Sequence, residues 1–396
     1  MRTVLLLLHR YIGLATALFL LLAGLTGSVL AFQHELDEWL NPTFYRTPGV
    51  GERLPPERLV ASLERAHPRM QVWYMEFPDE PQHAALLAMV PRTDPASGQP
   101  FDEKAVVRYL DPVTAEEVGQ RHWGECCFAP DKLVPFLLEF HYSLALPGNW
   151  GLWLMGGVAI LWFVDCFIAL CLTFPRRRPL IGKWATAWKV KRQRLNHDLH
   201  RAGGLWLWLL LTPVALSSVA MNLAEPVFKP VVSLLSPVAP SVYEARARLS
   251  KEQLGATTYG YDQAYRYAQE HGRRLGLSAP ITELYYSFEY HFYGAGFGDH
   301  ASDQGNAWLF FDGSDGRLLG QEIPGQGSWG ERFYRLQLPI HGGRIFGFAG
   351  RLLIAVLGLA IAVLAFTGLL IWWRKRRARR HARGRSGAPQ SSSMSR

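Results

Sequence analysis

Charged residues are missing from three long stretches of this 396-residue chain and almost missing from a fourth. Residues 11–33, 202–224 and 352–373 contain no Asp, Glu, Lys or Arg, and residues 150–174 contain only Asp165. Each stretch is long enough for an α-helix, which rises about 1.5 Å per residue, to cross a hydrocarbon core of about 30 Å. The missing charge therefore predicts four transmembrane helices.

The first stretch does not have the features of a cleaved signal peptide. Its apolar part is too long, and Phe32, Gln33 and His34 do not form a small-residue cleavage site. We therefore expect this segment to stay in the protein as a membrane anchor.

The chain is also poor in cysteine and lacks several cofactor motifs. Its four cysteines do not make a disulfide framework, and the adjacent Cys126 and Cys127 leave a disulfide, a link to another chain or free thiols open. The absence of Cys-x-x-Cys-His argues against covalent c-type haem, and the absence of His-Glu-x-x-His argues against a zinc protease. There is no phosphate-binding loop, so we expect no nucleotide site in this chain.

Basic residues are concentrated in two short segments. Residues 175–201 and 374–396 each hold nine Lys or Arg, whereas residues 35–149 and 222–345 are acidic on balance. Lys and Arg collect in short loops on the cytoplasmic side of membrane helices. We therefore expect both termini and the first basic segment inside, and the two long segments outside. Basic residues so close to membrane ends favour anionic membrane lipid over nucleic acid as a partner.

Four histidines occur at matching positions in the two halves of the chain, which indicates an internal duplication. The motif His-Arg-x-x-Gly-Leu begins at His9 and again at His200, at the start of the first and third apolar stretches. His141 and His341 precede the second and fourth stretches and are 200 positions apart. Both halves start on the same side of the membrane, so the pattern predicts two parallel repeats.

The two outside segments have the patterns of small α+β domains. Helical spacing is found at 59–66 and 261–271, and each segment ends with an Asp-containing turn, at Asp111 and Asp312. Strands are predicted at 72–75, 84–90, 105–110, 284–293 and 307–311. One helix on a small antiparallel sheet would suit each segment.

These features resemble the PepSY-associated transmembrane family. The resemblance rests on the His-Arg-x-x-Gly helix start, the Tyr-Leu-Asp-Pro turn at 109–112 and the Leu-Pro-x-His at 338–341, and it covers roughly residues 1–376. Ala115 replaces the glycine usual in the first turn. The family includes FoxB-like inner-membrane siderophore reductases. The resemblance therefore implies two haem b cofactors, a periplasmic ferric siderophore as substrate, and a cytoplasmic reductase or a quinol as electron donor.

The expected fold is a membrane protein, mainly α, with α+β extramembrane domains. Four transmembrane helices form two parallel repeats, each with a periplasmic PepSY-like α+β insertion, in a bacterial inner membrane with both termini cytoplasmic. The expected segments are transmembrane helices at 1–34, 141–175, 197–224 and 341–374, periplasmic domains at 35–140 and 225–340, a cytoplasmic loop at 176–196 and a disordered basic tail at 375–396.

The duplicated histidines are the candidate haem ligands. Haem iron commonly takes imidazole as its axial ligand, and ligands in a helix bundle come from facing helices. His9 and His200 would hold an inner haem, and His141 and His341 an outer one. About 22 helical residues separate the two levels, a rise near 33 Å, so one haem cannot serve both. His34 and His197 are rival ligands: His34 lacks a repeat partner, and His197 precedes His200 by one helical turn and could replace it or gate electrons.

Arginines near these histidines are candidates for the haem propionates, which accept paired hydrogen bonds. Arg10 and Arg201 adjoin the inner histidines, and Arg344 and Arg351 follow the last one. Asp165 has no partner expected at its depth. It would lie near an inner cofactor, relay protons or form a hydrogen bond within the bundle.

Residues 285–293 are rich in aromatic side chains. If they form one strand, Tyr285, Ser287, Glu289 and His291 share one face and the residues between them share the other. One face would build the sheet core, and the other would dock a bulky chelate over the outer haem.

Three functions remain open from the sequence. The first is a di-haem oxidoreductase that reduces a periplasmic ferric siderophore and releases Fe(II). The second is a non-enzymatic scaffold or regulator that binds a periplasmic protein. The third is a cytochrome b subunit of another periplasmic oxidoreductase.

Overall fold

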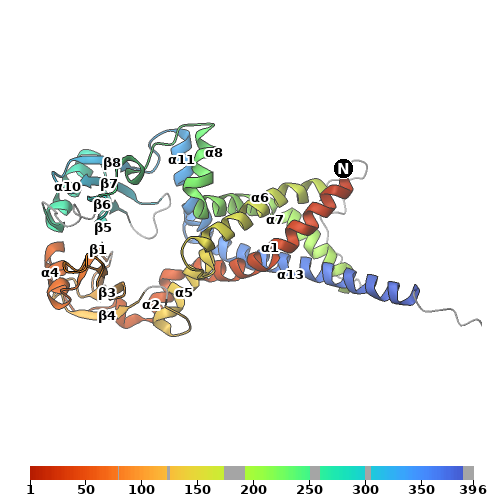
Figure 1. Ribbon diagram of the computed structural model, residues 1–396, viewed down its shortest axis with the longest axis horizontal. Helices are drawn as coiled ribbons and strands as arrows, with labels where there is room; N and C mark the ends of the chain where they lie inside the picture. Colours follow the sequence, from red (N-terminus) through yellow and green to blue (C-terminus); the bar gives the residue numbers. More distant parts are fainter. Residues whose placement is uncertain (79, 123–124, 174–191, 250–258, 299–304, 387–396) are drawn as a thin grey trace, which may run out of the picture.

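The protein has a helix bundle at one end and a lobe built around a sheet at the other (Figure 1). The computed structural model describes residues 1–78, 80–122, 125–173, 192–249, 259–298 and 305–386. The predicted cytoplasmic loop at 176–196 lies mostly outside these ranges.

Four long helices form the bundle: α1 (Arg2–Leu30), α6 (Trp150–Thr173), α7 (Arg192–Asn222) and α13 (Gly347–Ser386). Each contains a stretch long and apolar enough to cross a membrane, which agrees with the four predicted transmembrane helices. Helix α1 packs on α13, α13 on α7, α7 on α6 and α6 on α1. Helices α1 and α7 therefore occupy opposite corners of the bundle.

Helices α1 and α13 approach each other closely through small residues. A Cβ atom at Gly24 would lie 2.5 Å from the carbonyl oxygen of Gly358, so only glycine fits there. One turn on, the Ser28 hydroxyl donates a hydrogen bond to the Ala355 carbonyl oxygen at 2.8 Å. Small residues and interhelical hydrogen bonds are typical of helix contacts within membranes.

Two short helices stand beside the bundle at its sheet end, where the sequence predicted longer spans beginning at the histidines. Helix α5 (Pro130–Ser143) ends at Leu144, which has a left-handed backbone, before α6 begins. Helix α12 (Gln337–His341) is followed by the short η2 (Arg344–Phe346) and then by α13. The breaks let α5 pack against α1 and α12 against α7.

The strands of both outside segments form one sheet rather than two. Their order is β4-β3-β2-β1-β5-β6-β7-β8, and all neighbours are antiparallel. The strands are β1 (Met70–Glu76), β2 (Ala85–Pro91), β3 (Val106–Leu110), β4 (Glu117–Arg121), β5 (Ile281–Ser287), β6 (Phe292–Phe297), β7 (Ala307–Asp312) and β8 (Leu318–Glu322). The two halves join where Tyr74 of β1 pairs with Tyr285 of β5.

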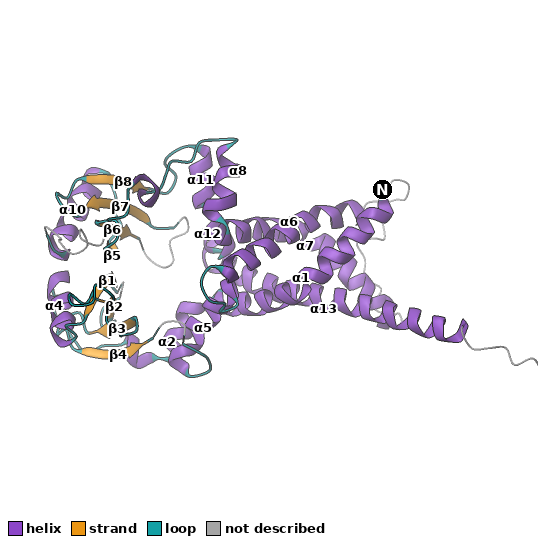
Figure 2. Cartoon of the chain, in the orientation of Figure 1, coloured by secondary structure: helices purple, strands orange, loops and turns teal. Residues whose placement is uncertain are grey.

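Two amphipathic helices, α4 (Pro56–Ala66) and α10 (Tyr261–Arg274), cover one face of this sheet. Leu59 and Leu63 of α4 and Ala264 of α10 are buried against strand residues such as Met75 and Leu284. Figures 1 and 2 show these helices at the end of the molecule farthest from the bundle. The opposite face of the sheet looks toward the bundle.

The predicted strand at 284–293 was wrong, because this segment is a hairpin. Strand β5 ends at Ser287 and β6 begins at Phe292, with His291 in a left-handed conformation (φ 52°) between them. The turn changes the alternation of faces. Tyr285 and Phe292 now lie on one face, with ring centroids 6.0 Å apart, and Tyr286 and Tyr293 on the other, 4.6 Å apart.

Short helices connect the bundle to the sheet lobe. They are α2 (Gln33–Leu40), α3 (Pro42–Tyr45), η1 (Ala224–Phe228), α8 (Lys229–Ser233), α9 (Val242–Ala245) and α11 (Trp329–Arg335). On one side, the buried ion pair of Asp37 and Arg121, 2.7 Å apart, ties α2 to β4. On the other side, Lys229 of α8 forms an ion pair with Glu244 of α9.

The basic tail differs in part from the prediction. Helix α13 continues to Ser386, so the first residues of the segment predicted to be disordered are helical. Ala, Arg and Lys favour helix, and extending an existing helix avoids the cost of nucleation. Residues 387–396 lie outside the described residues.

The turn between β3 and β4 gives a prediction about stability. Ala115 has a left-handed backbone (φ 62°), and Gly316 takes the same conformation (φ 73°) in the turn between β7 and β8. A left-handed backbone costs a non-glycine residue about 1 kcal/mol. We expect Ala115→Gly to raise the free energy of unfolding by up to about 1 kcal/mol, measured by thermal unfolding.

The matched control is Gly316→Ala, which should lower the unfolding temperature. Its Cβ atom would be strained by the backbone and would lie 2.2 Å from the Tyr267 ring. An Ala115→Gly variant that is less stable than the parent protein would contradict this account of the turn.

Candidate functional site

His9 and His200 face each other inside the bundle. They come from α1 and α7, the helices at opposite corners, and their ring centroids are 6.2 Å apart with planes at 46°. The chain begins near this level, at the end of the bundle farthest from the sheet (Figure 1). Two imidazoles from separate halves of the chain therefore meet at that end.

A second pair, His141 and His341, meets at the sheet end of the bundle. Its ring centroids are also 6.2 Å apart, with planes at 58°. These residues come from the short helices α5 and α12, which pack against α1 and α7. The same two helices, α1 and α7, thus organise both pairs.

The Nδ1 atoms of the inner pair are held by neighbouring helices. His9 Nδ1 lies 2.9 and 3.0 Å from the two carboxylate oxygens of Asp165 on α6. His200 Nδ1 lies 3.1 Å from both the Leu364 carbonyl oxygen and the Thr367 hydroxyl on α13. From the depth of Asp165 in the membrane, the sequence predicted no partner for its side chain. That expectation was wrong, because α6 places this carboxylate level with His9.

The Nδ1 atoms of the outer pair contact hydroxyl groups on the two corner helices. His141 Nδ1 lies 2.9 Å from Thr26 Oγ1 of α1, and His341 Nδ1 lies 3.1 Å from Ser217 Oγ of α7. Thr26 follows His9 by 17 positions, and Ser217 follows His200 by the same number. This matching offset was the sequence signal that could have found both hydroxyls.

The contacts with hydroxyls indicate the tautomer of three of the rings, those of His141, His200 and His341. The hydroxyls of Thr26, Ser217 and Thr367 each donate their own proton to a carbonyl three or four residues earlier in the helix, at 2.8–3.0 Å. Each hydroxyl is therefore left as an acceptor, so the facing histidine carries its proton on Nδ1. Across the described residues, no hydrogen bond is found at the Nε2 atom of any of the four rings. The Nε2 atom of each ring, with its lone pair, is thus left to bind a metal.

The two levels are closer together than the sequence predicted. The spacing of 17 residues corresponds to about 26 Å along a helix, against the predicted rise near 33 Å. The difference arises because α5 and α12 lie alongside the bundle. His141 and His341 therefore reach down to the level of Thr26 and Ser217. Apolar residues around Leu211, Leu357 and Ile361 fill the bundle between the levels.

The ring spacing fits two axial ligands of one iron. A metal–imidazole bond is about 2.0 Å long and the ring centre lies about 1.2 Å behind the bonded nitrogen, so two opposed imidazoles place their centroids about 6.4 Å apart. Both observed centroid distances are 6.2 Å. Rotation about the metal–nitrogen axis leaves the bonds unchanged, so the angles between the ring planes are compatible with this arrangement.

Glycines shape the space beside the rings. A Cβ atom at Gly13 or Gly204, one helical turn after His9 and His200 on the same helix face, would meet nothing within 4 Å, so the space at both positions is open. At Gly27 and Gly368 the opposite holds. A Cβ atom would lie 2.9 Å from the His141 ring and 3.1 Å from the His200 ring. Glycine thus leaves room for a flat cofactor on one side and lets the rings pack on the other.

Comparison with known proteins now identifies the family. The family model described as the PepSY-associated TM region matches residues 6–375. The chain belongs to this family. It is accordingly a multi-pass membrane protein of the PepSY type, and the resemblance drawn from its motifs is confirmed. The comparison with curated proteins found no match.

Two arginines of this PepSY-associated protein lie beside the inner pair. The Nε atom of Arg201 is buried and has no hydrogen-bond partner within the described ranges, while its guanidinium lies 3.6 Å from Asp198. Arg10 is half-buried and donates to the Tyr11 hydroxyl at 3.1 Å. An orphaned buried donor beside His200 suits an anionic group such as a haem propionate.

Arg351, the other candidate inside a span, is held by protein groups. It donates to the Ala31 carbonyl oxygen at 2.9 Å and pairs with Glu35 at 2.6 Å. The hydrogen bond from Arg351 holds the pKa of Glu35 below its ordinary value. Arg351 therefore anchors α13 to the end of α1. Arg344 lies in η2, next to the outer pair in the sequence.

Neither rival histidine takes part in a histidine pair in the part of the chain that the structure describes. His34 packs edge-on against Tyr45, with centroids 5.8 Å apart. His197 is exposed and lies 3.8 Å from Asp198. The geometry therefore favours the four duplicated histidines.

Neither a side-chain metal cluster nor a dinucleotide site is formed by the described residues of the PepSY-associated protein. No group of three or more His, Cys, Asp or Glu that could hold a metal ion occurs among the described residues. Residues 325–330 have the spacing Gly-x-Gly-x-x-Gly, which dinucleotide-binding proteins share. They follow an antiparallel edge strand, β8, and lead into the seven-residue α11. This is not the strand–helix–strand unit that binds dinucleotides.

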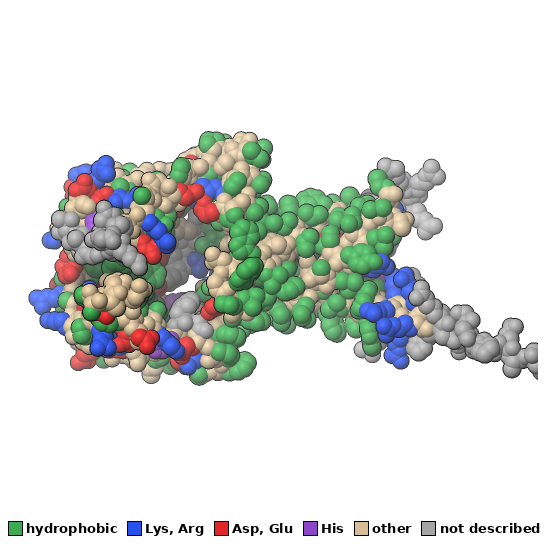
Figure 3. Space-filling view, viewed as in Figure 1, with side chains coloured by type: hydrophobic (Ala, Val, Ile, Leu, Met, Phe, Trp, Pro, Cys, Tyr) green, Lys and Arg blue, Asp and Glu red, His purple; other side chains and the backbone are tan. Residues whose placement is uncertain are grey.

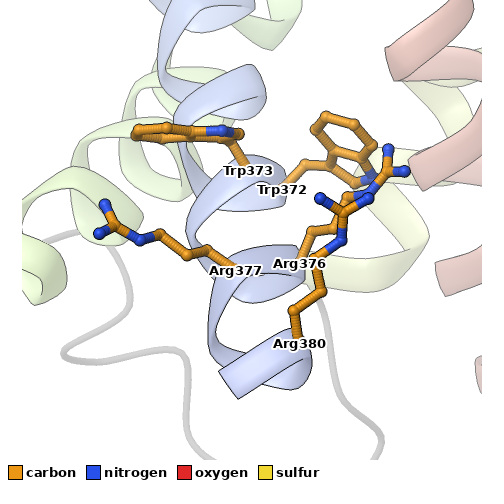
Figure 4. Close-up of a pocket in the computed structure, with 5 residues that line it drawn as sticks. All are labelled: Trp372, Trp373, Arg376, Arg377 and Arg380. Carbon is orange, nitrogen blue, oxygen red and sulfur yellow. The ribbon is translucent and has the colours of Figure 1, made fainter. Parts of the chain in front are cut away.

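The far end of α13 carries a basic and aromatic cluster. Trp372, Trp373, Arg376, Arg377 and Arg380 line a shallow pocket there (Figure 4). The Arg376 guanidinium lies over the Trp372 ring, 5.1 Å from its centre. Tryptophan followed by arginine is typical of a helix that leaves the membrane interface.

Proposed function

We propose that this protein is a di-haem b oxidoreductase of the bacterial inner membrane. It would pass electrons from the cytoplasmic side to a ferric siderophore in the periplasm and release Fe(II). The observation that carries the proposal is the presence of two facing imidazole pairs with ligand-like spacing, one at each end of the bundle. His9 and His200 would hold one haem, and His141 and His341 the other.

The proposed orientation rests on charge. Figure 3 shows apolar side chains over the visible face of the bundle and Lys and Arg side chains gathered at the end farthest from the sheet. Basic residues favour the cytoplasmic side, so this end, with both termini, would be inside. The sheet lobe would then be periplasmic, and anionic lipid would contact the arginines of α13.

The proposed duplication rests on matching geometry. The strand order reads the same outward from the β1–β5 contact, with four strands from each half. Each corner helix carries an inner histidine and, 17 positions later, the hydroxyl that holds an outer histidine. Two parallel repeats would produce both regularities.

The proposed substrate would approach the outer pair. Figure 3 shows a hollow between the sheet lobe and the bundle on the face in view, at the end where His141 and His341 meet. A bound haem would supply one-electron transfer. Reduction to Fe(II) weakens binding by hard oxygen ligands, so a siderophore would release the metal. The chain's own residues would orient the ligands and exclude water, and electrons would enter from a cytoplasmic reductase or a quinol.

An optical experiment on the full-length protein tests this function. The protein is purified in detergent, reduced with dithionite, freed of excess reductant and mixed without oxygen with a ferric hydroxamate and a ferrous-specific dye. The expected result is a haem b spectrum that reoxidises as the ferrous complex forms. A colourless protein would favour the scaffold alternative. A haem protein that leaves the ferric chelate unchanged would favour a cytochrome b subunit of another oxidoreductase.

A further inference from the structure

The two histidine pairs differ in the groups that hold their Nδ1 atoms. His9 faces both oxygens of the Asp165 carboxylate. The other three rings face neutral oxygens, from Thr26, Ser217, and Leu364 with Thr367. The two ends of the bundle are therefore electrostatically unequal, although their ring spacings are the same.

The position of Asp165 is costly for a residue with only a structural role. It lies within a membrane-spanning helix, and its side chain is 13% exposed. An acidic group at such depth is expensive and usually functional. Within the described residues, His9 is the only side chain that forms an ion pair with it. A hydroxyl serves the same orienting purpose at Thr26, so orientation alone does not require a carboxylate.

A carboxylate behind a ligating imidazole changes the metal as well as the geometry. It makes the ring a stronger electron donor, and this outer interaction tunes the potential of the iron. Its negative charge also stabilises the more positive, oxidised iron. Both effects lower the reduction potential. A neutral hydroxyl in the same place contributes no net charge.

We infer that Asp165 is a positioning residue that sets the potential of the inner haem below that of the outer haem. Electron transfer from the His9–His200 level to the His141–His341 level is then energetically favourable. A residue of α6 thus determines the direction of electron transfer. This inference rests on the proposed function and adds a direction to it.

A redox titration of single-haem proteins tests the inference. His341→Ala leaves only the inner haem, and His200→Ala leaves only the outer haem. Each is titrated by absorbance against an electrode, alone and together with Asp165→Asn, which keeps a hydrogen-bond acceptor but removes the charge. The inner haem should have the lower potential. Asp165→Asn should shift its redox equilibrium at least tenfold toward reduction, about 59 mV for one electron. The outer haem should not move.

Two further variants keep the test decisive. Asp165→Glu retains the charge and should keep the low potential. If the Asn variant does not hold the inner haem, Asp165→Thr, which copies the hydroxyl at Thr26, replaces it. The inference alone would be overturned if the protein binds two haems but the potential of the inner haem does not change when the charge at Asp165 is removed. It would also be overturned if the potential of the inner haem is higher than that of the outer haem. A protein without haem would overturn the proposed function as well.

Discussion

Replacing His200 by alanine should leave one haem per chain, where the proposed function gives the parent protein two. The imidazole of His200 lies 6.2 Å from that of His9, and a porphyrin iron between them would lose one of its two axial bonds. His9→Ala should give the same loss, because both rings serve one iron. His141→Ala and His341→Ala should each remove the other haem. The measurement is haem per protein, from the pyridine haemochrome spectrum.

Double variants separate this arrangement from general damage to the bundle. His9→Ala combined with His200→Ala should lose no more haem than either alone, because residues that act as one unit are not additive. His9→Ala combined with His141→Ala should lose both haems. His197→Ala, one helical turn before His200, and His34→Ala are the matched controls and should keep both. If all four paired variants retain two haems, the assignment of ligands is wrong.

The histidine pairs were accessible from the sequence because duplication leaves a constant offset. His9 and His200 are 191 positions apart and begin matching apolar stretches, so equivalent depth and facing directions could be inferred. Such stretches are also the strongest structural signal in a chain, since a membrane helix needs about 20 apolar residues. The four spans and the pairing of the four histidines at the two ends of the bundle therefore followed from pattern alone, although the distance between the two levels did not.

The groups behind the histidines did not follow from pattern. Asp165 is 156 positions from His9, and Thr367 is 167 positions from His200. Neither pair has a local spacing that marks it, because the contacts depend on how α6 and α13 rotate in the bundle. The predicted distance between the two histidine levels, which was counted from the helix ends, was also wrong, because α5 and α12 are separate helices.

In the sheet as well, local structure could be predicted from the sequence and long-range pairing could not. Most strands were located from their apolar alternation, but the pairing of β1 with β5 joins residues more than 200 positions apart and has no sequence signal of its own. The hairpin at 288–291 was missed because it contains no Gly, Pro, Asn or Asp. His291 supplies the left-handed residue instead, a conformation that histidine adopts more often than most side chains.

Filling the open space beside His200 should block the inner haem without disturbing the bundle. A Cβ atom at Gly204 meets nothing within 4 Å, and this residue follows His200 by one turn on the same helix face. Gly204→Leu should therefore be accommodated, and leucine should even favour the helix by about 1 kcal/mol over glycine. The leucine side chain would occupy the space that a porphyrin held by His200 requires. We expect one haem per chain, retained at the outer pair.

The control for added bulk is Leu209→Phe on the same helix. Leu209 is 72% exposed on the outside of the bundle, so a larger side chain there should leave both haems in place. Thermal unfolding of the haem-free proteins should give a midpoint for Gly204→Leu that equals or slightly exceeds that of the parent chain. Gly13→Leu should reproduce the loss from the opposite side, because Gly13 has the same relation to His9. Two haems in both leucine variants would mean that the space beside these glycines is not where the cofactor lies, even if the histidines are its ligands.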